Sequence, residues 1–263
     1  MKKENILEKI READMVLVGL GEDFDCPKCL RENGIYENGK ELLNEAGYRW
    51  VLPAWTSYCA DVLGESAVRE ALMKLEKILH DKNYYVVSVA TNSIIRDIPW
   101  KKEKLVMPCG DDMKKQCVKG CTGELLDVTE EERKLLKDAL SQLFEGKFPE
   151  MGIPRLGLCS RCGGDMILNN IYAESYNEDG YMGKWQIYTK WLQGTLNHKL
   201  VILELGVGLR FPSVIRWPFE KIAFYNKQAS FYRIHERLYQ MTEELSSKGI
   251  GIPRNAIDWI NDL

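Results

Sequence analysis

Two pairs of closely spaced cysteines constrain this chain more than any other feature. Cys117 and Cys121 form the first pair, and Cys159 and Cys162, with two glycines directly after them, form the second. Such pairs bind a tetrahedral metal ion, one pair from each turn, and glycines let backbone amides approach the sulfur atoms. Because four thiolates leave no open coordination position, the sequence predicts a structural zinc site that holds a small module together.

The cellular setting follows from cysteine usage and from what the N-terminus lacks. The chain of 263 residues has eight cysteines, no apolar run of 18 residues and no apolar signal segment. We therefore predict a cytoplasmic protein whose close cysteine pairs bind metal rather than form disulfides. The net charge of the chain is −3, and it lacks the excess of positive charge that is typical of proteins that bind nucleic acid. We therefore expect neither nucleic acid nor membrane as a partner.

A third cysteine pair, Cys26 and Cys29, has no obvious second pair in the sequence. These two residues form a redox dithiol, help to hold a metal with Cys59, or are plain structural cysteines. The spacing does not choose among these three interpretations.

Most of the remaining chain alternates helical and strand patterns. The apolar runs Met15–Val18 and Tyr84–Val89 are typical of strands buried on both faces of a parallel sheet. Helices are predicted at 4–13, 65–80, 129–145, 184–196, 215–226, about 236–247 and 255–262, and further strands at 199–205 and 230–234. We predict an α/β fold with a Rossmann-like doubly wound parallel sheet. Residues 1–105 and 165–263 would form a nucleotide-binding domain, and residues 106–164 an inserted zinc module.

Residues at the carboxyl ends of the predicted strands are the candidates for ligand binding. Gly19 and Gly21 follow the first strand, where an open α/β sheet usually binds a phosphate. A tight turn without a ligand explains these glycines equally well. Asn92 follows the second strand and would line the same crevice, or act only as a helix cap or turn residue.

Together these features resemble the sirtuin family, and within it the macrodomain-linked class M branch. The resemblance runs from about Pro108 to Ile234. It includes Cys159-x2-Cys162-Gly-Gly-Asp-Met, then Glu-Asp-Gly at 178–180, and is most specific in Glu-Leu-Gly-Val-Gly-Leu-Arg-Phe-Pro at 204–212 and Ile-Arg-Trp-Pro-Phe-Glu at 215–220.

The resemblance implies an NAD-binding domain with an inserted module that holds structural zinc. In this family nicotinamide is displaced from NAD, and ADP-ribose moves to an acyl oxygen or to a protein side chain. Carried over by position, the cofactor-binding residues would be Gly19 and Gly21 at the pyrophosphate, Asn92 at the nicotinamide ribose, Gly206, Val207 and Gly208 at the adenosine ribose, and His235 at the adenine.

Several positions depart from the family pattern. Cys109 stands where the family has its catalytic histidine, and could act as a nucleophile or weak base if its pKa is lowered. Ile94 replaces an aspartate, and His235 an asparagine. Glu-Asp-Phe-Asp at 22–25 replaces a run of small residues, and carboxylates there would repel a pyrophosphate unless they point to solvent or contact a ribose.

Three functions fit this combination of features. The first is an NAD-dependent protein ADP-ribosyltransferase, in which Asn92, Cys109 and an acidic residue act on NAD and an acceptor protein. The second is a sirtuin-fold protein that binds NAD or another nucleotide without turnover. The third is an NAD-dependent deacylase or NAD hydrolase.

Overall fold

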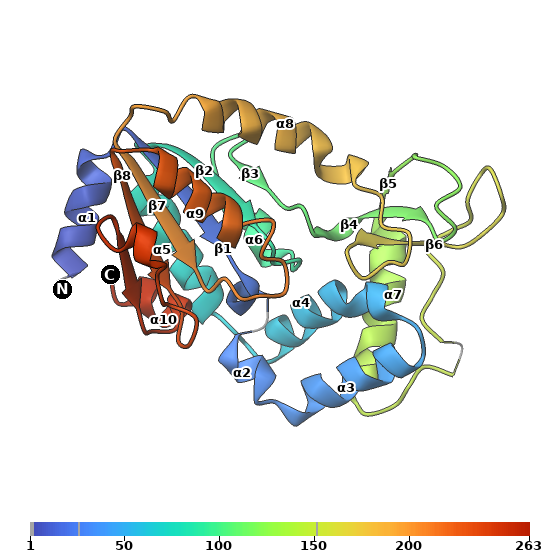
Figure 1. Cartoon of the computed structure of the whole chain (residues 1–263). Coiled ribbons are helices and arrows are strands. Elements are labelled where there is room, and N and C mark those ends of the chain that lie inside the picture. The colour runs from blue at the N-terminus through green and yellow to red at the C-terminus, as the bar shows by residue number, and fades with distance from the viewer. Residues whose placement is uncertain (1–2, 26, 151) are drawn as a thin grey trace.

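A six-stranded parallel sheet forms the centre of the protein (Figure 1). The computed structural model describes residues 3–25, 27–150 and 152–263. The strand order is β3-β2-β1-β7-β8-β9. The bounds are β1 Met15–Leu20, β2 Asn83–Ser88, β3 Leu105–Val106, β7 Leu200–Leu205, β8 Ala229–Ile234 and β9 Gly249–Ile252. The chain moves outward from β1 to one edge, then returns to β7 and moves to the other edge, which confirms the predicted doubly wound fold.

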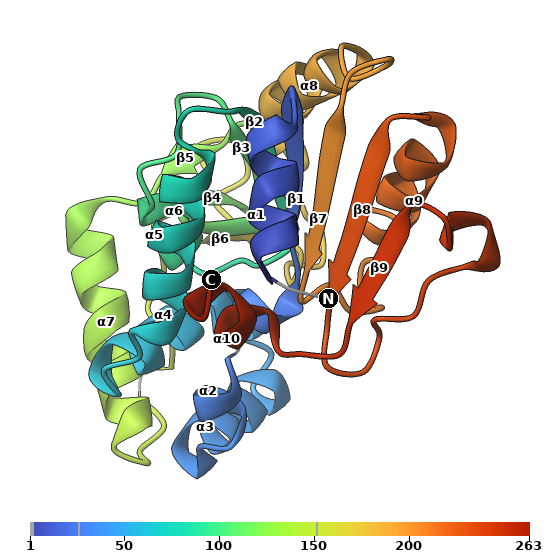
Figure 2. The same cartoon turned by 90° about the vertical axis from the view of Figure 1, so that its left-hand side faces the viewer.

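Helices cover both faces of this sheet, as Figures 1 and 2 show. Residues of β1 alternate between the two cores: Val16 and Val18 pack on one face, and Leu17 on the other. The first face carries α1 (Lys3–Glu12), α5 (Ala67–Leu79) and α10 (Ala256–Asn261), and the second carries α8 (Asp179–Gln193) and α9 (Arg216–Tyr225). Burial on both faces explains why the strands are continuous apolar runs.

A smaller part of the protein is built around an antiparallel sheet in the order β5-β4-β6. Its strands are β4 Gly110–Cys117, β5 Leu126–Asp127 and β6 Met166–Asn170. Helix α7 (Glu130–Phe144) begins in the predicted capping box, in which the Thr129 hydroxyl accepts from the Glu132 amide. The pairing of β4 with β6 carries this sheet past residue 164, where the sequence analysis ended the module.

Helices from an earlier segment of the chain complete the smaller part. These are α2 (Lys28–Arg31), α3 (Gly34–Glu45) and α4 (Leu52–Val62), while α6 (Ile94–Asp97) follows β2. Trp55 and Tyr58 of α4 pack their rings against Phe144 of α7. No helix is predicted from the sequence at residues 28–62, and the structure shows three α-helices there.

The predicted helix at 236–247 is wrong. This segment is a loop with one short 3-10 turn, η3 (Glu243–Leu245), and leads into β9. Arg233 donates to the carbonyl of Gln240, and Arg216 to that of Leu238. These buried guanidinium groups bind carbonyls that a helix would use internally, so tertiary contacts override the local amphipathic pattern. Within the described ranges, no helix has the length and apolarity needed to cross a bilayer.

Candidate functional site

A cleft of about 700 Å³ lies where the carboxyl ends of β1, β2 and β7 meet the helices of the smaller part. Ligands of open α/β sheets bind at this edge of the sheet. The cleft is lined by Glu22, Asp25, Thr91, Gly208, Leu209 and Arg210 from the strand ends, by Tyr172 after β6, and by Arg31, Tyr36, Glu37, Lys40, Asn44, Arg49, Leu52 and Thr56 from the helical segment. Its volume is in the range of small-molecule sites.

The turn after β1 packs directly against the loop after β7. A Cβ on Gly21 would lie 2.0 Å from the carbonyl oxygen of Gly206, so no larger residue fits there. Gly19 lies inside β1, where a Cβ would meet Ile215 at 2.5 Å and the ring of Phe219. Packing within the protein therefore explains both glycines. Their contact with a pyrophosphate stays a prediction.

The two acidic residues after Gly21 both have partners within the protein. Glu22 Oε2 accepts from the amide of Gly208 at 2.6 Å, and Oε1 accepts from the amide of Arg210 at 3.2 Å. Asp23 is buried and forms an ion pair with Arg31 at 3.1 Å. The loop predicted to contact the adenosine ribose is thus held by a carboxylate of the protein itself.

Asn92 is 2% exposed and lies against the segment that follows Glu22. Its side-chain Nδ2 donates to the carbonyl of Phe24 at 2.6 Å, and its backbone amide donates to Asp25 Oδ1 at 3.1 Å. Asn92 Oδ1 is buried and has no hydrogen-bond partner among the described residues. A buried oxygen that lacks a donor costs free energy, and a ligand that supplies an N–H group would recover it.

Cys109 is buried directly before β4. Its environment raises the pKa of the thiol, whereas a reactive thiol has a lowered pKa. Burial raises the pKa of Cys109 well above its ordinary value, and the negative charges of Asp25 and Glu22 raise it further. The predicted catalytic role of Cys109 required a lowered pKa. The thiol stays protonated, so a role as thiolate nucleophile or base is not supported.

A buried network of charged side chains fixes the loop after β7. Glu204, which is fully buried, accepts from Arg233 at 2.7 and 3.0 Å and pairs with Arg216 at 3.3 Å. Arg216 also donates to the carbonyl of Val207 at 2.6 Å. Arg233 reaches Glu220 of α9 at 2.7 Å. This network explains why the sequence around residues 204–220 has an unusual composition: its charged members hold the loop against α9 and β8.

His235 follows β8 and is half-buried at the same edge of the sheet. Its Nδ1 accepts from the amides of Arg237 and Leu238 at 3.0 and 3.1 Å. Burial lowers the pKa of His235. The ring is therefore neutral with its proton on Nε2, which leaves one N–H donor for a ligand or for water.

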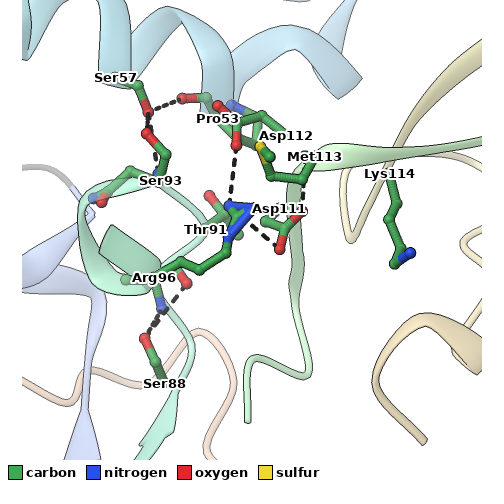
Figure 3. A network of polar contacts seen from close by, with 12 residues as sticks. Pro53, Ser57, Ser88, Thr91, Ser93, Arg96, Asp111, Asp112, Met113 and Lys114 are labelled. Atoms are coloured by element: carbon green, nitrogen blue, oxygen red, sulfur yellow. Dashed lines mark hydrogen bonds and ion pairs between the residues drawn. The ribbon is translucent and has the colours of Figure 1, made fainter. Parts of the chain in front are cut away.

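A polar cluster joins α4, α6 and β4, as Figure 3 shows. Arg96 lies between two carboxylates, with ion pairs to Asp111 at 3.4 Å and to Asp112 at 3.3 Å. Ser57 of α4 accepts from the amide of Ser93 at 3.3 Å. Burial, with the nearby charge of Asp111, raises the pKa of Asp112 to about 6, although Arg96 opposes this shift.

The four predicted metal ligands come together in the smaller part. The sulfur atoms of Cys117, Cys121, Cys159 and Cys162 all lie within 4.8 Å of one another. Sulfur–sulfur distances are 3.5 Å from Cys121 to Cys117 and to Cys159, and 3.6 Å from Cys117 to Cys162. A tetrahedral ion with bonds of about 2.3 Å requires sulfur atoms roughly 3.8 Å apart, so this set fits zinc.

The remaining cysteines do not form a second metal site in the part of the chain that the structure describes. Cys26 lies outside the described residues. Cys29 is exposed and its thiol donates to a carboxylate oxygen of Glu65, whereas Cys59 is buried in α4. The three interpretations of Cys26 and Cys29 therefore stay open.

Sequence reasoning missed most of the cleft. It flagged the acidic run at 22–25 only as a departure from a pattern, and it did not single out Tyr172, Arg210 or the cationic wall of Arg31, Lys40 and Arg49. Arg210 lies over the Tyr172 ring at 4.7 Å and donates to its hydroxyl at 2.9 Å. The sequence signal that could have identified Arg210 was its place directly after the glycine loop.

No family model matches the chain. A probable bifunctional ADP-ribose hydrolase/ADP-ribosyltransferase from Fusarium oxysporum is 31% identical over 125 residues, which are 47% of this chain and 20% of the fungal protein. This chain thus spans about a fifth of the length of that relative. A protein ADP-ribosyltransferase from Staphylococcus aureus is 20% identical over 260 residues, covering 92% of this chain and 80% of that protein.

Solved sirtuin structures match the whole chain. Sir2Tm bound to a propionylated peptide covers 100% of this chain and 97% of that one, with a TM-score of 0.57 and 11% identity. A Sir2 homologue mutant in complex with ADP-ribose matches with a TM-score of 0.56 and 11% identity, covering 100% of this chain and 94% of that one. The protein has the sirtuin fold, which confirms the fold that the resemblance in its sequence implied.

Proposed function

We propose that this protein is a sirtuin-like ADP-ribosyltransferase that transfers ADP-ribose from NAD to an acceptor protein. The observation that carries the proposal is the unpaired Oδ1 of Asn92. This oxygen is suited to accept a hydrogen bond from the carboxamide of nicotinamide. The names of the two relatives, from Fusarium oxysporum and Staphylococcus aureus, support transfer of ADP-ribose in preference to deacylation.

The cleft offers complementary groups for the other parts of NAD. Arg31, Lys40 and Arg49 line one wall of the cleft and would bind a diphosphate, Arg31 and Lys40 in exchange for their ion pairs with Asp23 and Glu37. The loop Gly206–Gly208 and the Nε2–H of His235 would contact the adenosine half. NAD supplies an activated bond between its ribose and nicotinamide, and the side chains of this chain bind and orient the dinucleotide and exclude water.

Zinc is the metal that suits the four-cysteine cluster. Cys117, Cys121, Cys159 and Cys162 would hold it with no open coordination position, so its contribution is structural. The ion would join the turn after β4 to the turn before β6, at the end of this pair where Cys117 lies opposite Met166. Cys109 directly precedes β4 at its other end. A cytoplasmic location and an acceptor protein as partner stay predictions.

Two measurements on the purified protein test the proposed function. We expect calorimetry to detect NAD binding, and we expect label from adenylate-labelled NAD to appear on a protein in cell lysate. Asn92→Ala should abolish both nicotinamide release and labelling. Gln142→Ala, which truncates an exposed amide side chain on α7, is the matched control and should leave both unchanged.

Each other result selects a different function. Binding without nicotinamide release would favour a nucleotide-binding protein without turnover. Nicotinamide release without any labelled protein would favour a hydrolase, or a deacylase if an acylated peptide stimulates the release. If NAD does not bind, the proposed function is wrong.

A further inference from the structure

We propose that Asp25 is the catalytic carboxylate of this site, a role that rests on the proposed function. In this proposal Asp25 stabilises the positive charge that develops on the nicotinamide ribose and takes the proton of the acceptor group. The family pattern has small residues in this segment, so the proposal concerns a feature of this chain.

The hydrogen bonds of Asp25 hold its carboxylate at the junction of two spaces. Oδ1 accepts from the amides of Thr91 and Asn92 at 2.8 and 3.1 Å, and the Thr91 hydroxyl lies 3.1 Å from each oxygen. All of these donors belong to the segment directly after β2. Asp25 lines the main cleft and also the small hollow beside Asn92. Asn92 lines only the hollow, so a ligand in the main cleft meets Asp25 at the border to Asn92.

Three other side chains interact electrostatically with Asp25, and two of them, Tyr172 and Arg210, also line the cleft. The negative charge of Asp25 raises the pKa of Cys109 and of Tyr172, in both cases after burial as the larger cause. Burial raises the pKa of Asp25 itself, and the positive charge of Arg210 opposes this shift. Asp25, Cys109, Tyr172 and Arg210 thus form one electrostatic cluster.

Within this cluster Asp25 is the group suited to act as a base. Burial raises its pKa and so makes the carboxylate a stronger base, while the hydrogen bonds from Thr91 and Asn92 stabilise its ionised form. Cys109 and Tyr172 keep their protons, and Arg210 is a cation. Glu22 also lines the cleft, but both of its oxygens accept from backbone amides, and Glu37 pairs with Lys40. Among the residues that the structure describes, the Thr91 hydroxyl is the one hydrogen-bond partner of Asp25 Oδ2, so this oxygen retains a free lone pair.

Bonds, electrons and the proton of the chemical step are all accounted for when Asp25 takes this role. The bond between the ribose C1′ and the nicotinamide nitrogen breaks, and its electron pair leaves with nicotinamide as a neutral molecule. A bond forms between C1′ and an oxygen or nitrogen of the acceptor, whose proton moves to Asp25. A carboxylate next to C1′ stabilises the cationic transition state, as carboxylates do in glycoside hydrolysis.

Asp25→Asn tests the assignment because asparagine retains an oxygen that accepts the Thr91 and Asn92 amides. We expect nicotinamide release to fall at least about 100-fold, as for loss of a general base. Calorimetry supplies a readout independent of activity. Because nicotinamide in NAD is cationic and ADP-ribose lacks it, the affinity for NAD should fall about tenfold relative to that for ADP-ribose. Asp127→Asn, on exposed β5, should change neither quantity.

A second variant distinguishes a catalytic role of Asp25 from a purely structural one. Asp25→Gly leaves space for a small carboxylate, and we expect formate to restore part of the nicotinamide release. Loss of activity with an unchanged ratio of NAD to ADP-ribose affinities and no rescue by formate would overturn the assignment. Full activity of Asp25→Asn would also overturn it. The proposed function has a test that is independent of Asp25: it is wrong if the wild-type protein binds no NAD or transfers no ADP-ribose.

Discussion

Glu22 and Gly208 lie 186 residues apart in the sequence and are joined by a hydrogen bond of 2.6 Å from the Gly208 amide to the Glu22 carboxylate. This bond connects the turn after β1 to the loop after β7, two segments at the carboxyl edge of the sheet. Amides in such a loop are ordinarily available to an anion. In this protein a carboxylate of the chain takes that place.

Replacing Glu22 should therefore change how the cleft binds anions. Glu22→Gln retains a hydrogen-bond acceptor and removes the negative charge. We expect calorimetry to show ADP-ribose binding about fivefold more tightly, because about 1 kcal/mol of repulsion is removed. Glu131→Gln, exposed on α7 and outside the cleft lining, is the matched control and should leave the affinity unchanged. Weaker binding of ADP-ribose by Glu22→Gln would show instead that Glu22 contacts the ligand through a ribose hydroxyl.

The four-cysteine cluster predicts that the purified protein contains about one zinc ion per chain. Cys159→Ser removes one ligand, and we expect loss of zinc in elemental analysis and a lower melting temperature. A chelator should destabilise the wild-type protein in the same way, because metal binding contributes to folding free energy. Cys29→Ser, an exposed cysteine outside the cluster, should retain the metal. Purified protein without zinc would contradict the assignment.

The buried network around Glu204 predicts a large loss of stability when one charge is removed. Glu204→Gln leaves Arg233 and Arg216 without their shared carboxylate. We expect the free energy of unfolding, measured in urea, to fall by about 3 kcal/mol. The exposed ion pair between Glu12 and Lys9 is a control, and Glu12→Gln should cost less than about 1 kcal/mol. Equal effects of the two substitutions would refute this account.

The raised pKa of Asp112 predicts how the free energy of unfolding depends on pH. Its pKa is about 6 in the folded protein, above its ordinary value of 3.8, so the folded state holds the proton more tightly than the unfolded state. The contribution of protonated Asp112 to the free energy of unfolding is present below pH 4 and is lost as the pH rises through 6. Asp112→Asn should remove it, a change of up to about 3 kcal/mol between pH 4 and 7. Unfolding in urea at several pH values measures it.

Asp127→Asn is the control for this pH dependence. Asp127 is exposed, and the hydrogen bond from Lys114 lowers the pKa of its carboxyl. Its substitution should leave intact the decline in stability between pH 4 and 6. If the wild-type protein shows no such decline, Asp112 does not titrate as described.

The sequence by itself determined the features that depend on local pattern. The apolar runs specified β1, β2 and β7, because strands buried on both faces need continuous apolar residues. The spacing of Cys117, Cys121, Cys159 and Cys162 determined the metal site, since close pairs of thiols already form half of a tetrahedron. The capping residues Thr129 and Glu132 fixed the start of α7 because a cap acts within one turn.

Only the tertiary structure decided which residues meet at the cleft. The strand order brings Glu22 to Gly208, and Asp25 to Thr91, across long separations in sequence that no local pattern encodes. It also places residues 28–62 beside α7 and turns the helical pattern at 236–247 into a loop. The physical reason is that buried charges and carbonyl groups take partners according to position in space, whereas periodicity reports only which face of an element is buried.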